Sequence, residues 1–234
     1  MSEEDENNFY RLVAFVVDVA PEVIREYFKR KALHGDTFES YLNKHKHILY
    51  HLVFLRDCCE CPSKESPCKD KALSNEQMKL VYDFIGSNPC KNSEQIKALK
   101  LKIKHFCICK YSARKNISVK DVLDTTIACC IVKNCEPKNN SRDNWMTQIK
   151  NTRNKIVHKT DTRSISSVEF EADWDTLKGS VMGLASLLDK EYETHVCNQV
   201  DNLKSRQILN TDKIKEVQLL HEWWRDKMFE IEVR

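Results

Sequence analysis

The sequence predicts an all-α fold, and three observations carry that prediction. The 234-residue chain contains only 4 Gly and 5 Pro, too few for the frequent turns of a β-sandwich or barrel. Apolar residues recur every three or four positions through most of the chain, which is the period of a helix with one buried side. Hydrophobic residues make up 41% of the chain, enough to fill a sizeable core.

The amino-terminal part is expected to begin with a disordered acidic tail over residues 1–8. A helix then starts at Phe9, and Pro21 interrupts it, because proline lacks the amide hydrogen that a helix interior needs. Proline suits the first turn of a helix, so a second segment is expected to start there. The turn Gly35-Asp36 ends that segment.

Capping residues place the next two helices. Asp36 and Glu39 resemble a capping box ahead of a stripe of leucines and isoleucine. The Cys- and Pro-rich segment 57–73 follows and has no hydrophobic period, so we interpret it as an exposed loop. Ser74 and Gln77 then predict the start of another helix, expected to continue until Gly86-Ser-Asn-Pro.

The middle of the chain is Lys-rich, and its pattern favours a helix over 93–110, although a strand also fits the alternation of leucine and lysine. Ser118 and Asp121 are expected to cap a further helix that ends before the polar segment 134–140. Ser141 starts a helix that ends near His158.

Ser166 and Glu169 predict another helix start. From there an apolar stripe continues to Val196 at alternating steps of three and four, which suits packing against a neighbouring helix or a second copy. Gly179 and Gly183 lie one turn apart in this stripe and suggest close helix approach. The expected organisation is one helical domain over 9–206, with an inserted Cys/Lys-rich middle and a C-terminal helix within 207–234.

The motif RNKIVH at 153–158 is the candidate for chemistry. It brings the guanidinium of Arg153, the amide of Asn154 and the imidazole of His158 within about two helical turns. A neutral imidazole can take a proton from a ribose 2′-hydroxyl, and a guanidinium can hold the charge of the phosphorane. Such a site would cleave RNA without a metal.

Helix geometry restricts this motif. At about 100° per residue, Asn154 and His158 share a side of the helix, while Arg153 lies nearer Val157. The three groups converge only if the helix unwinds at His158, or if two copies pack across a twofold axis. The competing interpretation is structural: Arg153 pairs with an acidic side chain, and His158 satisfies carbonyls at the helix end.

Three blocks carry a family resemblance: NNFYRLVAFVVDVAPEVIREYF at 7–28, DVLDTTIACCIVKN at 121–134 and WMTQIKNTRNKIVHKTDTRSISSVEFEADW at 145–174. They resemble the HEPN family (higher eukaryotes and prokaryotes nucleotide-binding), in the animal branch typified by the DAZ-interacting zinc-finger ubiquitin ligase. The resemblance extends over roughly residues 7–190, and HEWWRDK near the end is similar to that branch's trailing helix. The Cys-rich loop and the segment 93–115 depart from the branch.

The resemblance implies an antiparallel helical bundle that forms homodimers. It implies a dimerisation and signalling module of the kind found in animal innate-immune receptor or ubiquitin-ligase proteins, with single-stranded RNA or nucleotide and signalling domains as partners. In active relatives it implies a metal-independent endoribonuclease, whose functional residues would here be Arg153 and His158, with Asn154 as their polar neighbour. Module and enzyme are therefore the two function classes to separate.

Two further residue groups bear on binding. Lysines that could follow a phosphate backbone are Lys97, Lys100, Lys102, Lys104, Lys150 and Lys155. Cys58, Cys61 and Cys68 could form a zinc site together with His47 or His51. Because one Cys-x2-Cys lacks a matching pair, we interpret these cysteines as loop thiols and expect no metal and no cofactor.

Composition bounds the remaining possibilities. The formal net charge is only +3, from 38 basic and 35 acidic residues, so any basic surface must be local. The acidic start is unlike a secretory signal, and no run approaches the roughly 20 apolar residues that cross a bilayer. We therefore expect a cytoplasmic protein that does not enter membranes, with its 11 cysteines reduced.

Overall fold

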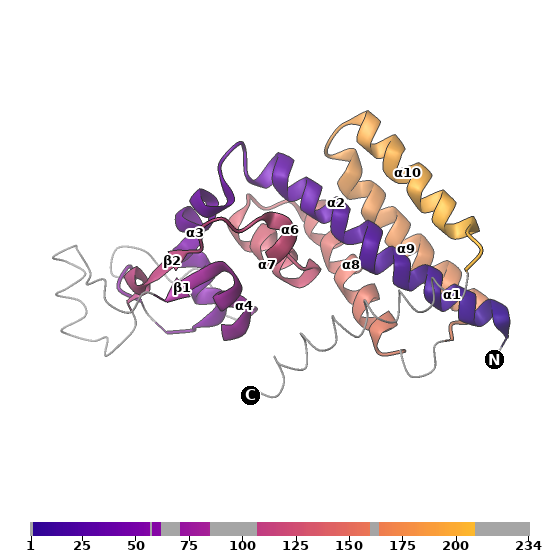
Figure 1. Ribbon diagram of the computed structural model, residues 1–234, viewed down its shortest axis with the longest axis horizontal. Coiled ribbons are helices and arrows are strands. Elements are labelled where there is room, and N and C mark those ends of the chain that lie inside the picture. Colours follow the sequence, from indigo (N-terminus) through magenta and orange to yellow (C-terminus); the bar gives the residue numbers. More distant parts are fainter. Residues whose placement is uncertain (1, 57, 62–70, 85–106, 160–163, 209–234) are drawn as a thin grey trace. The chain divides into compact units, whose positions relative to one another are not determined.

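The computed structural model describes residues 2–56, 58–61, 71–84, 107–159 and 164–208 (Figure 1). They belong to two compact units. The bundle unit comprises residues 1–32, 124–129 and 138–234, and the cysteine-rich unit comprises residues 33–123 and 130–137. The second unit is therefore inserted into the sequence of the first. It contains the Cys-rich middle that the sequence predicts as an insertion within a single domain over 9–206.

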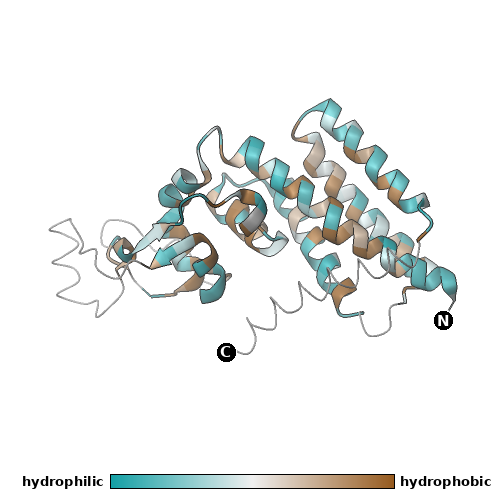
Figure 2. Cartoon of the chain, in the orientation of Figure 1, coloured by the Kyte–Doolittle hydropathy of each residue, from teal (hydrophilic) through white to brown (hydrophobic). Residues whose placement is uncertain are grey.

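Long helices build the bundle unit: α1 (Glu3–Ala14), α2 (Ala20–Tyr27), α8 (Asn140–Val157), α9 (Ser167–Ser186) and α10 (Lys190–Ser205). In Figure 1, α9 lies between α8 and α10, and it also contacts α1 and α2. Figure 2 shows that α10 is hydrophilic over most of its visible surface, whereas α9 carries more apolar residues. Because α9 contacts four other helices of the unit, its apolar residues form a central part of the core.

Trp174 of α9 is the largest fully buried side chain of this unit. Its ring lies 4.8 Å from the ring of Phe15 and 5.2 Å from the ring of Phe170. Phe15 belongs to a π-helical turn, Phe15–Val19, between α1 and α2. The wider turn therefore positions the aromatic residue that covers Trp174.

Pro21 is the physical reason for that π-helical turn. The amide of Ala20 donates to the carbonyl of Phe15, five residues back, and the proline ring would clash with the carbonyl that an uninterrupted α-helix places beneath it. A second helical segment does begin beside the proline, at Ala20, as the sequence predicts. The chain passes from one segment to the other through helical turns.

The amino terminus differs from the expected tail, because α1 already begins at Glu3. Ser2 and Asp5 form a capping box, and the first turn carries the acidic residues Glu3, Glu4, Asp5 and Glu6. Carboxylates stabilise the positive end of the helix dipole. The acidic composition that suggests a disordered tail is thus also a helix-start signal.

The cysteine-rich unit contains α3 (Phe38–Val53), α4 (Asn75–Val81), β1 (Tyr82–Phe84), a 3-10 turn (Ile108–Lys110), β2 (Tyr111–Ala113), α6 (Val119–Val122) and the second half of α7 (Thr125–Cys135). Strands β1 and β2 pair antiparallel with Asp83 opposite Ser112. The apolar side of α3 forms its core through Leu42, Leu49 and Leu52, each no more than 2% exposed.

Helix starts in this unit follow the predicted capping residues closely. Ser74 and Gln77 form the expected capping box of α4, whereas Thr37, one residue after Asp36, caps α3. The end of α4 differs from the prediction. The helix stops at Val81 and the chain continues as β1, so Phe84 is 63% exposed and contacts the Tyr111 ring of β2.

The helical class of the fold is confirmed, with one two-stranded sheet among the described residues. Within that part of the chain, none of the helices is both long and apolar enough to cross a bilayer. The predicted C-terminal helix, except for residues up to 208, and most of the predicted helix over 93–110 lie outside the described residues.

Candidate functional site

Arg153 lies in the last turns of α8, and its side chain is part of the bundle core. The residue is only 5% exposed. Its Nη1 donates to the hydroxyl of Thr126 over 3.0 Å, and its Nη2 lies 3.7 Å from the carboxylate of Asp124. The guanidinium therefore has acidic and hydroxyl partners inside the same unit.

His158 ends α8 and is exposed, while Asn154 is half-buried. The backbone amide of His158 donates to the carbonyl of Asn154 over 3.1 Å, so α8 keeps its helical hydrogen bonding up to this residue. Five residues separate Arg153 from His158, which corresponds to a rotation of about 140° around the helix axis. Within one chain, the imidazole and the guanidinium therefore point to different sides of α8.

The lysines near His158 are engaged with carboxylates of α9. Lys155 lies 2.9 Å from Glu169 and 2.8 Å from Asp173, and Lys159 also contacts Glu169. Hydrogen bonds from Lys159 and then Lys155 lower the pKa of Glu169 below its usual range. The charges of these two lysines and two carboxylates thus largely neutralise one another.

The remaining lysines predicted to contact nucleic acid separate into two groups. Lys150 is half-buried on α8. Lys97, Lys100, Lys102 and Lys104 lie outside the described residues. The basic surface predicted from the sequence is therefore described only at Lys150 and Lys155.

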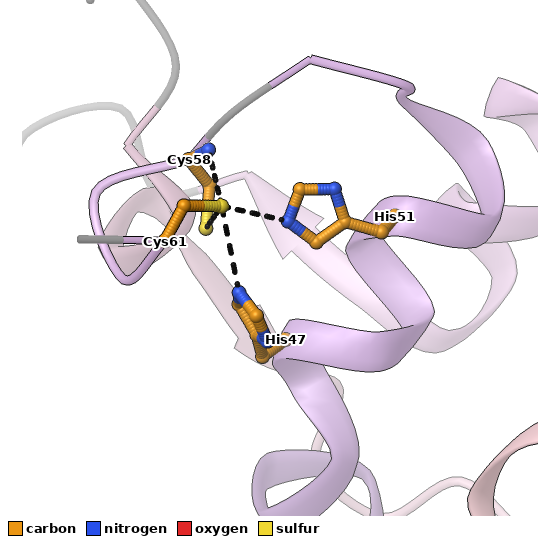
Figure 3. Close-up of side chains that lie close together, drawn as sticks. All are labelled: His47, His51, Cys58 and Cys61. Atoms are coloured by element: carbon orange, nitrogen blue, oxygen red, sulfur yellow. Dashed lines mark hydrogen bonds between the residues drawn. The ribbon is translucent and has the colours of Figure 1, made fainter. Parts of the chain in front are cut away.

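A second cluster lies in the cysteine-rich unit, where two histidines of α3 meet two cysteines of the following turn (Figure 3). The four ligand atoms of His47, His51, Cys58 and Cys61 lie within 4.8 Å of one another. The Sγ of Cys61 is 3.2 Å from the Nε2 of His51, 3.7 Å from the Nε2 of His47 and 3.7 Å from the Sγ of Cys58. Two nitrogen and two sulfur atoms thus gather around the Cys61 side chain.

The local structure explains this convergence. His47 and His51 are four residues apart on a helix, so both rings lie on one side of it, with centroids 4.8 Å apart. After α3 ends at Val53, the chain makes a tight turn in which the Cys61 amide donates to the Cys58 carbonyl over 3.2 Å. A Cys-x2-Cys spacing in such a turn brings both thiols to the same side.

Three of these four side chains are buried. His51 and Cys58 are fully buried and His47 is 8% exposed, while Cys61 is partly exposed. Burial raises the pKa of the Cys58 thiol to about 12, although a hydrogen bond from the Glu60 amide opposes that rise. Cys58 and Cys59 are thus buried within a segment for which the sequence favours an exposed loop.

The sequence analysis identifies these residues as candidate zinc ligands but does not favour the zinc site. Cys58 and Cys61 belong to the zinc alternative weighed against loop thiols, and the structure brings both His47 and His51 to them. Cys68, the third cysteine of that alternative, lies outside the described residues.

Sequence reasoning missed a third group. Cys59, Cys107 and Cys109 also cluster, with sulfur distances of 3.6 Å (Cys59 to Cys107) and 3.8 Å (Cys59 to Cys109). Burial raises the pKa of the Cys109 thiol to about 12. These cysteines are 48 and 50 residues apart in sequence, so no local spacing could have indicated their contact.

Comparison of the chain with family models, curated proteins and solved structures finds no match in any of the three. The likeness to the HEPN family therefore remains a resemblance of sequence motifs.

Proposed function

We propose that this chain is a HEPN-type helical module that forms homodimers and assembles signalling proteins, without nuclease activity of its own. The observation that carries the non-catalytic part of the proposal is the burial of Arg153, while the homodimer and the signalling partners rest on the family resemblance. A guanidinium that is 5% exposed and bonded to Thr126 within its own unit stabilises the bundle. It would have to leave these partners before it could hold a phosphate.

The ion pairs of the lysines near His158 in the sequence support the non-catalytic part of the proposal. Anionic RNA is held by cationic side chains that are not neutralised by protein carboxylates. Here Lys155 has two carboxylate partners, Glu169 and Asp173. An approaching phosphodiester would meet these acidic groups along with the lysine.

Light scattering on the purified chain tests the assembly part of the proposal. We expect a mass of twice the chain mass, maintained on dilution through the micromolar range. A monomer at every concentration would contradict the proposed homodimer.

The second candidate function is a metal-independent endoribonuclease assembled across that dimer. It is favoured by one observation, the exposure of the His158 imidazole at the end of α8, where it is accessible as a general base. Within one chain, Arg153 and His158 point to different sides of α8. In this candidate, the second copy would therefore supply the cationic group beside His158.

Incubation with single-stranded RNA separates the two candidates. We expect the same background cleavage from the wild-type chain and from His158→Ala, with and without a chelator. Cleavage that leaves cyclic-phosphate ends, resists the chelator and disappears in His158→Ala would contradict the non-catalytic module and establish the enzyme. Circular dichroism of both proteins shows whether the variant is folded.

A further inference from the structure

The four ligand atoms of the His47, His51, Cys58 and Cys61 cluster lie within 4.8 Å of one another, and the three distances from the Cys61 sulfur are close to the edges of a zinc coordination shell. Typical bonds are about 2.3 Å for Zn–S and about 2.0–2.1 Å for Zn–N. A tetrahedron with those bonds has an S–S edge of about 3.8 Å and an S–N edge of about 3.6 Å. The structure has one S–S distance of 3.7 Å and S–N distances of 3.7 and 3.2 Å.

The charge of the ligand set also suits a buried divalent ion. Two thiolates supply two negative charges, two neutral imidazoles supply none, and Zn²⁺ cancels the thiolates. A neutral complex avoids the large cost of burying an uncompensated charge. This matters because Cys58 and His51 are fully buried.

Backbone amides already point at both sulfur atoms. The Glu60 amide donates to the Sγ of Cys58 over 3.4 Å, and the Cys58 amide donates to the Sγ of Cys61 over 3.2 Å. Donors of this kind stabilise negative charge on sulfur. The turn thus supplies an amide donor for each thiolate of a metal complex, and its sulfur atoms, 3.7 Å apart, are well beyond the roughly 2.05 Å of a disulfide bond.

We propose that His47, His51, Cys58 and Cys61 bind one structural Zn²⁺. Two thiolates and two imidazoles in a tetrahedral arrangement are a ligand set that selects zinc. Four protein ligands fill the coordination shell, so no position is left for a substrate. Binding converts two thiols to thiolates and releases their two protons to solvent.

The ion fastens the turn after α3 to the last two turns of that helix. Such a link would stabilise the cysteine-rich unit, because the described elements that follow the turn, as far as β2, are short: α4 has seven residues, and β1 and β2 have three each. Small folds with little regular structure commonly gain their stability from a metal. We do not extend the proposal to Cys59, Cys107 and Cys109, because among the described residues this group offers three ligands, one short of a closed shell.

Metal analysis of the full chain tests the proposal. The chain is purified without a histidine tag, dialysed against metal-free buffer and measured by mass spectrometry of its elements. We expect Cys58→Ser and His51→Gln each to contain about one zinc per chain less than the wild type. The matched controls Cys197→Ser, in α10, and His45→Gln, on α3 but outside the cluster, are expected to retain the wild-type content.

Cobalt provides a readout that identifies the ligands. Reconstitution of the metal-free chain with Co²⁺ is expected to give the visible absorption bands of a tetrahedral site and a sulfur-to-cobalt charge-transfer band. His51→Gln should change the visible bands, and Cys58→Ser should weaken the charge-transfer band. Spectra of octahedral aqueous cobalt in the wild type would overturn the proposal.

Thiol alkylation tests the unmodified chain and does not depend on a variant that folds. We expect Cys58 and Cys61 to resist iodoacetamide in the wild type and to be labelled after treatment with a zinc chelator, whereas Cys197 is labelled to the same extent in both conditions. If zinc is not stoichiometric, or if the chelator leaves labelling of Cys58 and Cys61 unchanged, the site does not exist.

Discussion

The contacts of Arg153 in the structure support a structural role alone, whereas the sequence allows two roles, catalytic and structural. Its spacing from His158 is that of a nuclease motif, but its hydrogen bond to Thr126 and its ion pair with Asp124 are those of a core residue. Removing it would leave the Thr126 hydroxyl without this donor and Asp124 without this cation. The expected first effect of mutation is therefore on stability.

Arg153→Ala is expected to lower the free energy of unfolding by about 1–3 kcal/mol, the usual cost of leaving buried polar groups without their partner. Urea denaturation measures this loss. Lys150→Ala, one turn earlier on α8 and half-buried, is the control and should change stability by no more than about 0.5 kcal/mol. Equal stability of Arg153→Ala and wild type would mean that the guanidinium is not a structural group.

Two glycines on α9 provide a paired test of packing. A methyl group at Gly183 would overlap the ring of Trp145 on α8, whereas one at Gly179 has no atom within 4 Å. Gly179→Ala should therefore stabilise the chain by about 1 kcal/mol through helix propensity. Gly183→Ala should destabilise it by about 1–3 kcal/mol through overpacking. Thermal unfolding of both variants checks the opposite signs; two stabilised variants would contradict the close approach of α8 and α9.

At the level of elements, the contact between α8 and α9 has an apolar side and a charged side. On the charged side, Lys155 of α8 and Lys159, two residues after the end of α8, hold Glu169 in the first turn of α9. Glu169 also occupies the third position after the cap Ser166. One carboxylate thus takes part in starting α9 and in joining it to α8.

Acid should weaken this contact. Because Lys159 and Lys155 lower the pKa of Glu169, its contribution to stability is present above the unfolded pKa, about 4.3, and is lost as the pH falls through the lower folded value. The contribution is about 1 kcal/mol or less, since Lys155 is 45% exposed and solvent screens the pair. Glu169→Gln should therefore flatten the acid side of the stability profile.

Urea denaturation at a series of pH values between neutral and about pH 3 measures the difference. Glu171→Gln, which removes a 54%-exposed partner of Lys204, serves as the control and should keep the wild-type profile. Parallel profiles for wild type and Glu169→Gln would rule out the proposed role of the carboxylate.

The sequence predicts helix starts better than the ends of elements. Ser74 and Ser166 accept the predicted backbone hydrogen bonds, because a capping interaction spans three residues and is visible as a local pattern. The end of α4 depends on pairing between Tyr82–Phe84 and Tyr111–Ala113. That contact is distant in sequence, so apolar periodicity alone wrongly extends the helix through Phe84.

At the scale of the whole molecule, the sequence likewise predicts one part of the candidate metal cluster and not the other. The Cys-x2-Cys and the two histidines four apart are visible in the sequence, and they lie close enough along the chain to be considered together. The sequence could not show that the segment after α3 folds back and is buried. The group of Cys59, Cys107 and Cys109 depends on contacts over 48 residues and more and was beyond prediction.

If zinc fastens the cysteine-rich unit, a chelator should loosen that unit selectively. Hydrogen exchange followed by mass spectrometry is expected to show lost protection in α3 (Phe38–Val53), while α9 (Ser167–Ser186) keeps most of its protection. Re-addition of zinc should restore α3. Unchanged exchange in α3 after complete removal of the metal would show that the turn is held by protein contacts alone.

Because residues 33–123 are inserted within the sequence of the bundle unit, the proposed zinc ion would also affect the stability of that unit. While the cysteine-rich unit is folded, the separation of its two ends is fixed. Once it unfolds, the bundle has to close a long flexible loop before Asp124 can meet α8, and each doubling of such a loop costs about 0.6 kcal/mol of entropy. Loss of one metal ion would then affect the bundle unit through chain connectivity alone.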